Sequence, residues 1–151
     1  MPNANVLPIS TAKSLSWSWR GANFVRIEPG PYMATCCRWK GPEWIPAYRR
    51  YGFRLIFQLV SEDIEVTMFI NFGAKPQPPQ SLASRYFKAW TVANGDAPLR
   101  GQAMAPTVFV EGGLLYTIEV EDAAIDPTTK KDKPDCLIYS RVKEILNVTR
   151  K

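Results

Sequence analysis

The stretch IEVTMFINF, residues 64–72, alternates apolar and polar side chains, and this period of two constrains the fold more than any other feature of the chain. Side chains of a β-strand point to its two faces in turn, so the pattern predicts a strand with one buried face. The apolar face consists of Ile64, Val66, Met68, Ile70 and Phe72. Phe69 falls among the polar residues of the other face, where its ring must be covered by the chain or presented to a ligand.

Four further stretches have strand character. Residues 32–39 and the dense apolar run 53–60 come before the alternating strand. Residues 107–123 hold a hairpin-like Gly-Gly pair at 112–113, and apolar residues alternate with polar ones after it. A last strand covers about 136–148, after a charged loop at 126–135 that we expect to be flexible.

A single helix is expected between the third and fourth strands, in SLASRYFKAWTVANG at 81–95. Ser81 is the predicted N-cap, and Asn94 with Gly95 predicts the end. Apolar residues recur at helical spacing and predict one buried face, made of Leu82, Tyr86, Ala89 or Trp90, and Ala93. Arg85 and Lys88 are expected to point away from it.

The chain of 151 residues is the size of one domain, large enough to bury a core without disulfide bonds. Residues 1–28 are polar and aperiodic apart from SWSW, which predicts a flexible arm docked through Trp17, Trp19 and Phe24. Residues 29–151 then form the domain. The predicted class is a mostly β domain with one helix.

Positive charge and aromatic rings are concentrated in CCRWKGPEWIPAYRRYGFR, residues 36–54. This stretch holds five basic residues and one acid, so it carries most of the chain's formal charge of +5. A local basic excess is typical of a face that binds an anion. The alternative is a cationic hairpin whose rings only close a small core.

Five strands with one helix between the third and fourth resemble the layout of the OB-fold, a five-stranded Greek-key barrel. Over residues 29–149 the chain resembles the single-stranded DNA-binding proteins of that fold. PGPY at 29–32, SRYFKAW at 84–90 and YSRV at 139–142 resemble small proteins carried by phages and integrated mobile elements. The resemblance implies an OB-fold-like barrel. This chain ends in NVTRK and not in the acidic tail usual in the bacterial proteins, so we do not expect the partner-recruiting role of that tail.

The predicted function is binding of single-stranded DNA, or RNA, without strong sequence preference, because bases stack on exposed rings while Arg and Lys contact the phosphates. The rings expected to stack are Trp39, Trp44, Tyr48, Tyr51 and Phe69. The cations expected to contact phosphates are Arg38, Lys40, Arg49, Arg50 and Arg54. On the last strand, Tyr139, Arg141 and Lys143 would extend the same groove.

The alternative function is a protein-interaction scaffold in a larger complex of a phage or mobile element. Trp, Tyr and Arg are enriched at the energetic centres of protein interfaces, so the composition fits this role equally well. The arm or the helix would then bind the partner. Assembly into a homo-oligomer is left open.

The composition argues against an enzyme. The chain has no histidine and no CxxC pair, so we expect no zinc site and no metal. It has neither GxxxxGK[ST] nor GxGxxG, and we expect no cofactor. The acids at 62–65 and 119–126 are interpreted mainly as solvated surface charge, with a Mg²⁺ site at 119–126 as the lesser reading.

Three cysteines, two of them adjacent, are typical of reduced thiols in a cytosol. No stretch approaches the ~20 apolar residues of a membrane span, and the N-terminus lacks the pattern of a secretory signal. We therefore expect a cytoplasmic protein without a membrane partner.

Overall fold

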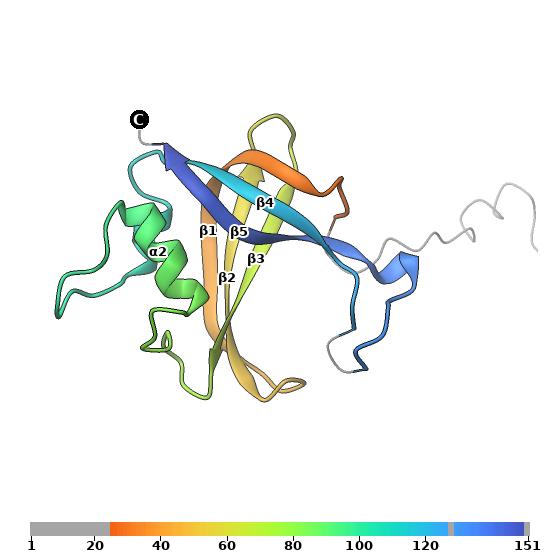
Figure 1. The fold of residues 1–151 in the computed structure, drawn as a ribbon, viewed down its shortest axis with the longest axis horizontal. Helices are drawn as coiled ribbons and strands as arrows, with labels where there is room; N and C mark the ends of the chain where they lie inside the picture. The colour runs from red at the N-terminus through yellow and green to blue at the C-terminus, as the bar shows by residue number, and fades with distance from the viewer. Residues whose placement is uncertain (1–24, 127–128, 150–151) are drawn as a thin grey trace, which may run out of the picture.

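The computed structural model describes residues 25–126 and 129–149, which form a mostly β fold (Figure 1). Five antiparallel strands make one sheet in the order β3-β2-β1-β4-β5. The strands are β1 (Gly30–Ile45), β2 (Arg50–Leu59), β3 (Glu65–Gly73), β4 (Leu115–Ala123) and β5 (Tyr139–Thr149). The α-helix α2 (Arg85–Asn94) lies between β3 and β4 in the chain, and two short 3₁₀ helices are η1 (Pro106–Phe109) and η2 (Asp135–Leu137). The predicted strand number and helix position are confirmed.

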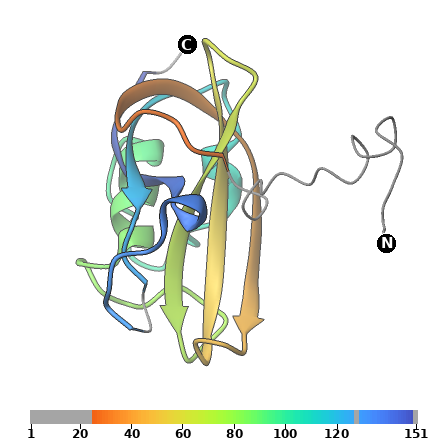
Figure 2. The same cartoon turned by 90° about the vertical axis from the view of Figure 1, so that its right-hand side faces the viewer.

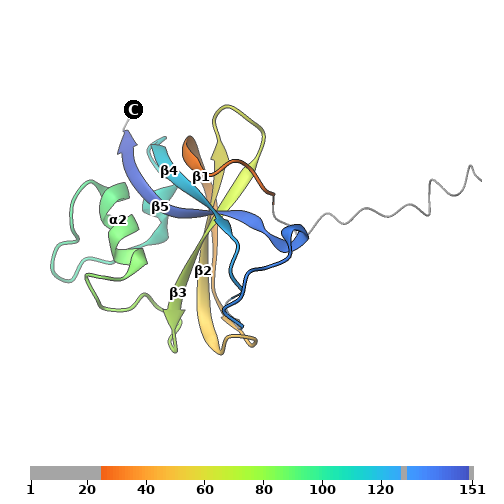
Figure 3. The same ribbon diagram turned by 45° about the vertical axis from the view of Figure 1, so that its right-hand side comes forward.

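The sheet is curled but not closed, and β3 and β5 are its two edge strands. Figures 1 and 3 show β5 crossing close to β3, and residues of the two strands contact each other. Within the described residues, however, no ladder of backbone hydrogen bonds joins them. We call the line along which these two edges meet the seam.

Strand β1 is twice as long as the sequence predicted, because it continues through Gly41 and Pro42, where we expected a loop. Register shifts at Cys36/Arg38 and Lys40/Glu43 absorb the irregular residues, as β-bulges do. Gly41 has φ 105°, and a Cβ there would lie 2.7 Å from the carbonyl oxygen of Gly52. Glycine therefore lets the two strands approach, and residues 36–54 form a β-hairpin.

The core lies between the curled sheet and α2, on one face of each strand. The predicted apolar face of β3 is confirmed, since Val66, Met68, Ile70 and Phe72 are buried. Helix α2 packs Tyr86, Ala89, Trp90 and Ala93 into this core. Tyr86 meets Phe53 and Phe72 edge-on at 5.4 and 5.5 Å, and its hydroxyl donates to the carbonyl of Met104. Figure 2 shows the helix behind the sheet.

Helix α2 begins later than predicted, because Ser84 and not Ser81 is the N-cap. The Ser84 hydroxyl accepts from the backbone N–H of Phe87, whereas Ser81 accepts from Ala83 in a preceding turn. Leu82 therefore lies outside the helix and is 75% exposed, so its predicted place on the buried face was wrong. The helix ends where the sequence predicted, because Gly95 has φ 89° and its N–H donates to the Thr91 carbonyl.

Residues 107–110 were expected in a strand but belong to η1 and the turn after it. The pair Gly112 and Gly113 has φ 73° and 59°, so it forms a left-handed turn that leads into β4 and joins no strand pair. Phe109 of η1 is buried in the core.

Residues 25–28 of the predicted arm contact the start of β5. The Ser140 N–H donates to the Val25 carbonyl at 2.8 Å, and the Ile27 N–H donates to the Ser140 hydroxyl at 2.7 Å. Arg26 forms ion pairs with Asp122 and Asp135. The predicted flexible segment 1–24, with its anchors Trp17, Trp19 and Phe24, lies outside the described residues.

Candidate nucleic-acid interface

Strands β1, β2 and β3 share an outer face that points away from the core. In β2, Phe53 and Leu55 are buried while Arg54 between them is half-buried, as the alternation of a strand requires. Arg54 is in register with Lys40 on β1 and with Phe69 on β3. These three side chains therefore form one row across the outer face.

At one end of the outer face lies a cavity of about 360 Å³, which we call the groove. It is lined by Ile45, Tyr48, Arg50, Gly52, Phe53, Arg54, Phe69, Ile70, Asn71, Arg85, Tyr139 and Arg141. A neighbouring hollow of about 520 Å³ shares Tyr48, Tyr139 and Arg141 with it and adds Ile125, Asp126, Lys130 and Lys133. The two hollows make a trough between the β1–β2 turn and the β4–β5 loop.

The β1–β2 turn carries Tyr48 at its tip. Two backbone N–H groups, of Tyr48 and Arg49, donate to the Ile45 carbonyl at 3.2 and 2.9 Å. Pro46 has a fixed φ that suits the start of a turn, and Arg49 takes the left-handed φ of 52° that reverses the chain. Tyr48 is 44% exposed, and the Arg50 guanidinium lies 4.9 Å from the centre of its ring. This stacked pair forms one wall of the trough.

The β4–β5 loop is organised by backbone hydrogen bonds in its described residues. The Asp126 N–H donates to the Lys131 carbonyl at 2.9 Å, and the Lys133 N–H donates to the Ala124 carbonyl at 2.8 Å. This small hairpin holds the Lys133 ammonium 4.5 Å from the centre of the Tyr139 ring. The opposite wall of the trough is therefore also a cation beside a tyrosine.

Phe69 and Tyr139 join the two walls across the seam. Their ring centres are 6.2 Å apart, with the planes at 71°. Both residues are half-buried, and burial raises the pKa of Tyr139. Phe69 is thus the ring out of place on the polar face of β3, and another part of the chain covers it in part.

The arginines of the groove differ in how their charge is neutralised. Arg54 pairs with Glu43, and Arg141 pairs with Glu121, each with a shortest N–O distance of 2.7 Å. Arg50 and Arg85 have no acidic partner within 4 Å among the residues of 25–126 and 129–149. The groove therefore keeps positive charge that can attract an anion.

The structure brings six of the predicted site residues together in the groove: Tyr48, Arg50, Arg54, Phe69, Tyr139 and Arg141. Lys40 lies on the same outer face, in the row with Arg54 and Phe69, but does not line the groove. Arg49 and Lys143 are exposed outside its lining.

Three predicted rings lie on the core side of the hairpin. Trp39 is in register with Leu55 and packs half-buried against the core. Trp44 and Tyr51 meet edge-on at 5.2 Å, and Tyr51 also packs against the core. The two bulges of β1 change the phase of its alternation, which separates these rings from the groove.

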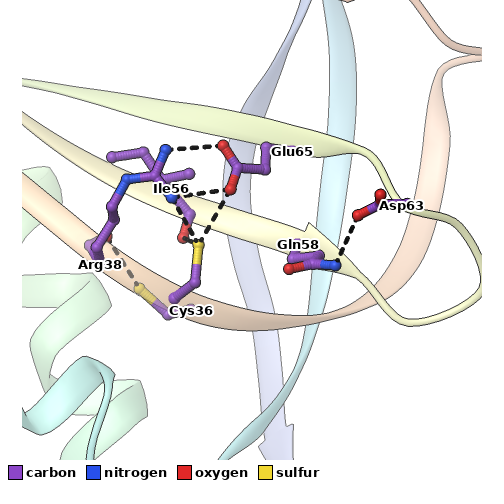
Figure 4. A network of polar contacts seen from close by, with 7 residues as sticks. Cys36, Arg38, Ile56, Gln58, Asp63 and Glu65 are labelled. Carbon is purple, nitrogen blue, oxygen red and sulfur yellow. Dashed lines mark hydrogen bonds and ion pairs between the residues drawn. The ribbon is translucent and has the colours of Figure 1, made fainter.

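Arg38 lies at the far end of the outer face, in an ion-paired patch that we define as Cys37, Arg38, Gln58, Asp63 and Glu65. Figure 4 shows Arg38, Gln58, Asp63 and Glu65 of this patch. The Arg38 guanidinium donates twice to the Glu65 carboxylate, at 2.8 Å each, and this holds the pKa of Glu65 below its ordinary value. The bulge at Cys36/Arg38 turns both Cys37 and Arg38 outward, which makes this pairing with β3 possible.

The patch offers little chemistry of its own. Cys37 donates to the Ile56 carbonyl at 3.2 Å, and burial followed by the Glu65 charge raises the pKa of its thiol. Burial raises the pKa of Cys36 to about 12, so this thiol stays protonated and unreactive at neutral pH. Within the described residues, no three His, Cys, Asp or Glu side chains cluster as a metal site would require.

Four residues of the trough were not predicted from the sequence: Asn71 and Arg85 in the groove, and Lys130 and Lys133 in the neighbouring hollow. The two lysines were assigned to a charged loop, and Arg85 to the outside of the helix. The sequence around these residues does not indicate their place, because contacts between segments distant in the chain bring the helix start and the β4–β5 loop to the trough.

No protein-family model matches this sequence, and no curated protein matches it either. No helix in the part of the chain that the structure describes has the length and apolar character needed to cross a bilayer.

Proposed function

We propose that this protein binds single-stranded nucleic acid along the trough between the β1–β2 turn and the β4–β5 loop. The observation that carries the proposal is that rings and cations from three separate segments converge there: Tyr48 with Arg50, Phe69, and Tyr139 with Lys133. Aromatic side chains that stack bases beside cations that follow the phosphates are the usual means of binding a single strand.

We also propose that the fold is an OB-fold-like barrel that is open along the seam. The strand order places β1 between β2 and β4, as a Greek-key barrel opened between β3 and β5 would do. In OB-folds, the face of strands 2 and 3 and the loops 1–2 and 4–5 bind oligonucleotides. The trough occupies the corresponding place here.

In this function Tyr48, Phe69 and Tyr139 stack on bases, while Arg50, Arg141 and Lys133 contact phosphates. Every base has a π-face, so stacking tolerates any sequence. The proposed preference is therefore for single strands over duplexes, with little discrimination among sequences.

The test is a titration of fluorescent oligo(dT) at low and moderate salt. We expect binding that weakens by roughly 0.7 log units per log unit of salt for each phosphate contacted. Duplex DNA of the same length is the control and should bind more weakly. If oligo(dT) fails to bind even at low salt, the proposal is wrong.

A scaffold role in a larger assembly is the second candidate, and one observation favours it. A hollow of about 570 Å³ lies beside the start of α2, away from the groove, and two of its lining residues, Leu82 and Leu99, are 75% and 76% exposed. Exposed apolar side chains around a hollow are typical of a surface that binds another protein. A cytoplasmic phage or mobile-element complex is the setting that fits either role.

A further inference from the structure

Arg85, the first residue of α2, reaches across the seam. Its Nη1 donates to the Phe69 carbonyl of β3 at 2.7 Å, and its Nη2 donates to the Val142 carbonyl of β5 at 3.3 Å. Nη2 also donates to the carbonyl of Lys143. One guanidinium thus binds the backbone of both edge strands, which do not bind each other through a ladder.

The chemistry of the guanidinium suits this bridge. Its two terminal nitrogens diverge in a rigid plane, so they can satisfy acceptors on two strands at once. All three acceptors are neutral carbonyls on the two edge strands of the sheet. Burial lowers the pKa of Arg85, and the Arg141 charge adds to this, but arginine remains charged at neutral pH.

The start of α2 is fixed firmly enough to hold Arg85 in place. The Ser84 hydroxyl caps the first turn, and Tyr86 and Trp90 are buried in the core, where their polar atoms donate to the carbonyls of Met104 and Ala105. Arg85 therefore projects from a rigid base.

The Arg85 bridge acts next to the rings of the groove. One of its acceptors is the backbone of Phe69, whose ring contacts Tyr139 at the start of β5. The spacing of these two rings depends on how closely β3 approaches β5. Arg85 also lines the groove, where its charge has no acidic partner among the described residues.

We propose that Arg85 is a positioning residue of the nucleic-acid groove: it clamps β3 to β5 and thereby sets the spacing of Phe69 and Tyr139 for stacking. This inference rests on the proposed function. Direct phosphate binding by Arg85 is the competing role, and the experiment separates the two.

The first experiment measures oligo(dT) binding by Arg85→Lys. A lysine keeps the charge but has a single nitrogen, which cannot replace two diverging donors. If Arg85 positions the rings, Arg85→Lys should weaken binding by about tenfold, the loss of roughly one stacked base, while the salt slope stays unchanged. The matched control Arg38→Lys makes the same exchange at a bidentate arginine outside the groove and should bind as the wild type does.

Inorganic polyphosphate, a polyanion without bases, is the second probe. Its binding should change less than twofold in Arg85→Lys, since no ring is involved. Wild-type affinity of Arg85→Lys for oligo(dT), or an equal loss for polyphosphate, would overturn the positioning role.

A third measurement needs no ligand. The nuclear Overhauser effect between the rings of Phe69 and Tyr139 should be present in the wild type and lost in Arg85→Lys. The effect between the rings of Phe57 and Tyr116, whose centres are 5.4 Å apart in the core, should persist in both proteins and shows that the variant is folded. A retained Phe69–Tyr139 signal would refute the clamp. A wild type that fails to bind oligo(dT) would instead refute the proposed function, and the ring signal would still decide on the clamp.

Discussion

The two ends of the outer face of β1–β3 each hold an arginine from the same hairpin, but the two arginines have different surroundings. At one end, Arg38 is bound by both oxygens of Glu65, and its neighbours Gln58 and Asp63 bind each other. At the other end, Arg50 stacks on Tyr48 and has no acidic partner in the part of the chain that the structure describes, and Phe69 and Tyr139 supply further rings.

The comparison shows that basic composition alone does not identify a binding surface. Arg38 and Arg50 come from the same aromatic, basic hairpin and would count equally in any tally of charge. The two arginines differ in whether an acid neutralises the charge and in whether aromatic rings lie beside it. The Arg38 end is therefore a natural internal control for the groove.

The largest expected effect comes from removing two rings of the groove. The double substitution Phe69→Ala with Tyr139→Ala should reduce the binding free energy for oligo(dT) by about 2–6 kcal/mol, because each stacked base contributes roughly 1–3 kcal/mol. Titration calorimetry measures this. The control is Trp44→Ala, which removes a 48% exposed ring on the core side of the hairpin. An equal loss in the control would remove the distinction between the groove and the rest of the hairpin.

The second largest effect is a difference in oligo(dT) binding between substitutions of Arg50 and of Arg38. Arg50→Ala should weaken binding and reduce the salt slope by about 0.7, the contribution of one phosphate contact on a single strand. Arg38→Ala removes the same charge from the same face but outside the groove, and both quantities should stay at their wild-type values. Binding at several salt concentrations checks this. Equal effects of the two substitutions would mean that only net charge matters.

A smaller effect is expected from releasing an arginine that is already paired. Glu43→Gln removes the partner of Arg54 in the groove, so oligo(dT) should bind up to about fivefold more tightly, in keeping with the roughly 0.2–1 kcal/mol of an exposed ion pair. Glu65→Gln releases Arg38 at the other end and should leave affinity unchanged. Tighter binding by Glu65→Gln would show that the paired end also contacts the ligand.

The smallest effect is a pH dependence of the ion-paired patch. The hydrogen bonds from Arg38 lower the pKa of Glu65, so the pair stabilises the folded state at neutral pH and loses this contribution as the pH falls through the lowered pKa. The wild type should melt slightly above Glu65→Gln at pH 7, and the difference should vanish near pH 2. Calorimetric melting at both pH values measures it. A difference that persists or grows in acid would contradict the assigned pairing.

The strands and the helix could be predicted because their signals are local. The alternation of residues 64–72 identified the buried face of β3, and it also marked Phe69 as out of place. The faces of Trp39 and Trp44 could not be predicted, because two bulges and the continuation of β1 through Gly41 and Pro42 shift the alternation. A β-bulge leaves no reliable trace in the sequence.

The groove could be predicted only in part. Phe69 follows from alternation in β3, Arg54 from the local basic excess of residues 36–54, and Tyr139 and Arg141 from alternation in β5. Arg85 was expected on the solvent side of the helix, since helical periodicity does not reveal that the first turn lies against an open seam. Its role depends on the approach of β3 to β5, which are distant in the chain.

The most direct test of the central claim is a titration of ¹⁵N-labelled protein with oligo(dT), followed by amide chemical shifts. The account predicts that the largest changes fall on Tyr48, Arg50, Phe69, Tyr139 and Arg141, and that the amides of Arg38 and Glu65 stay in place. Changes centred on the Arg38 end, or on Leu82 and Leu99 beside α2, would contradict it.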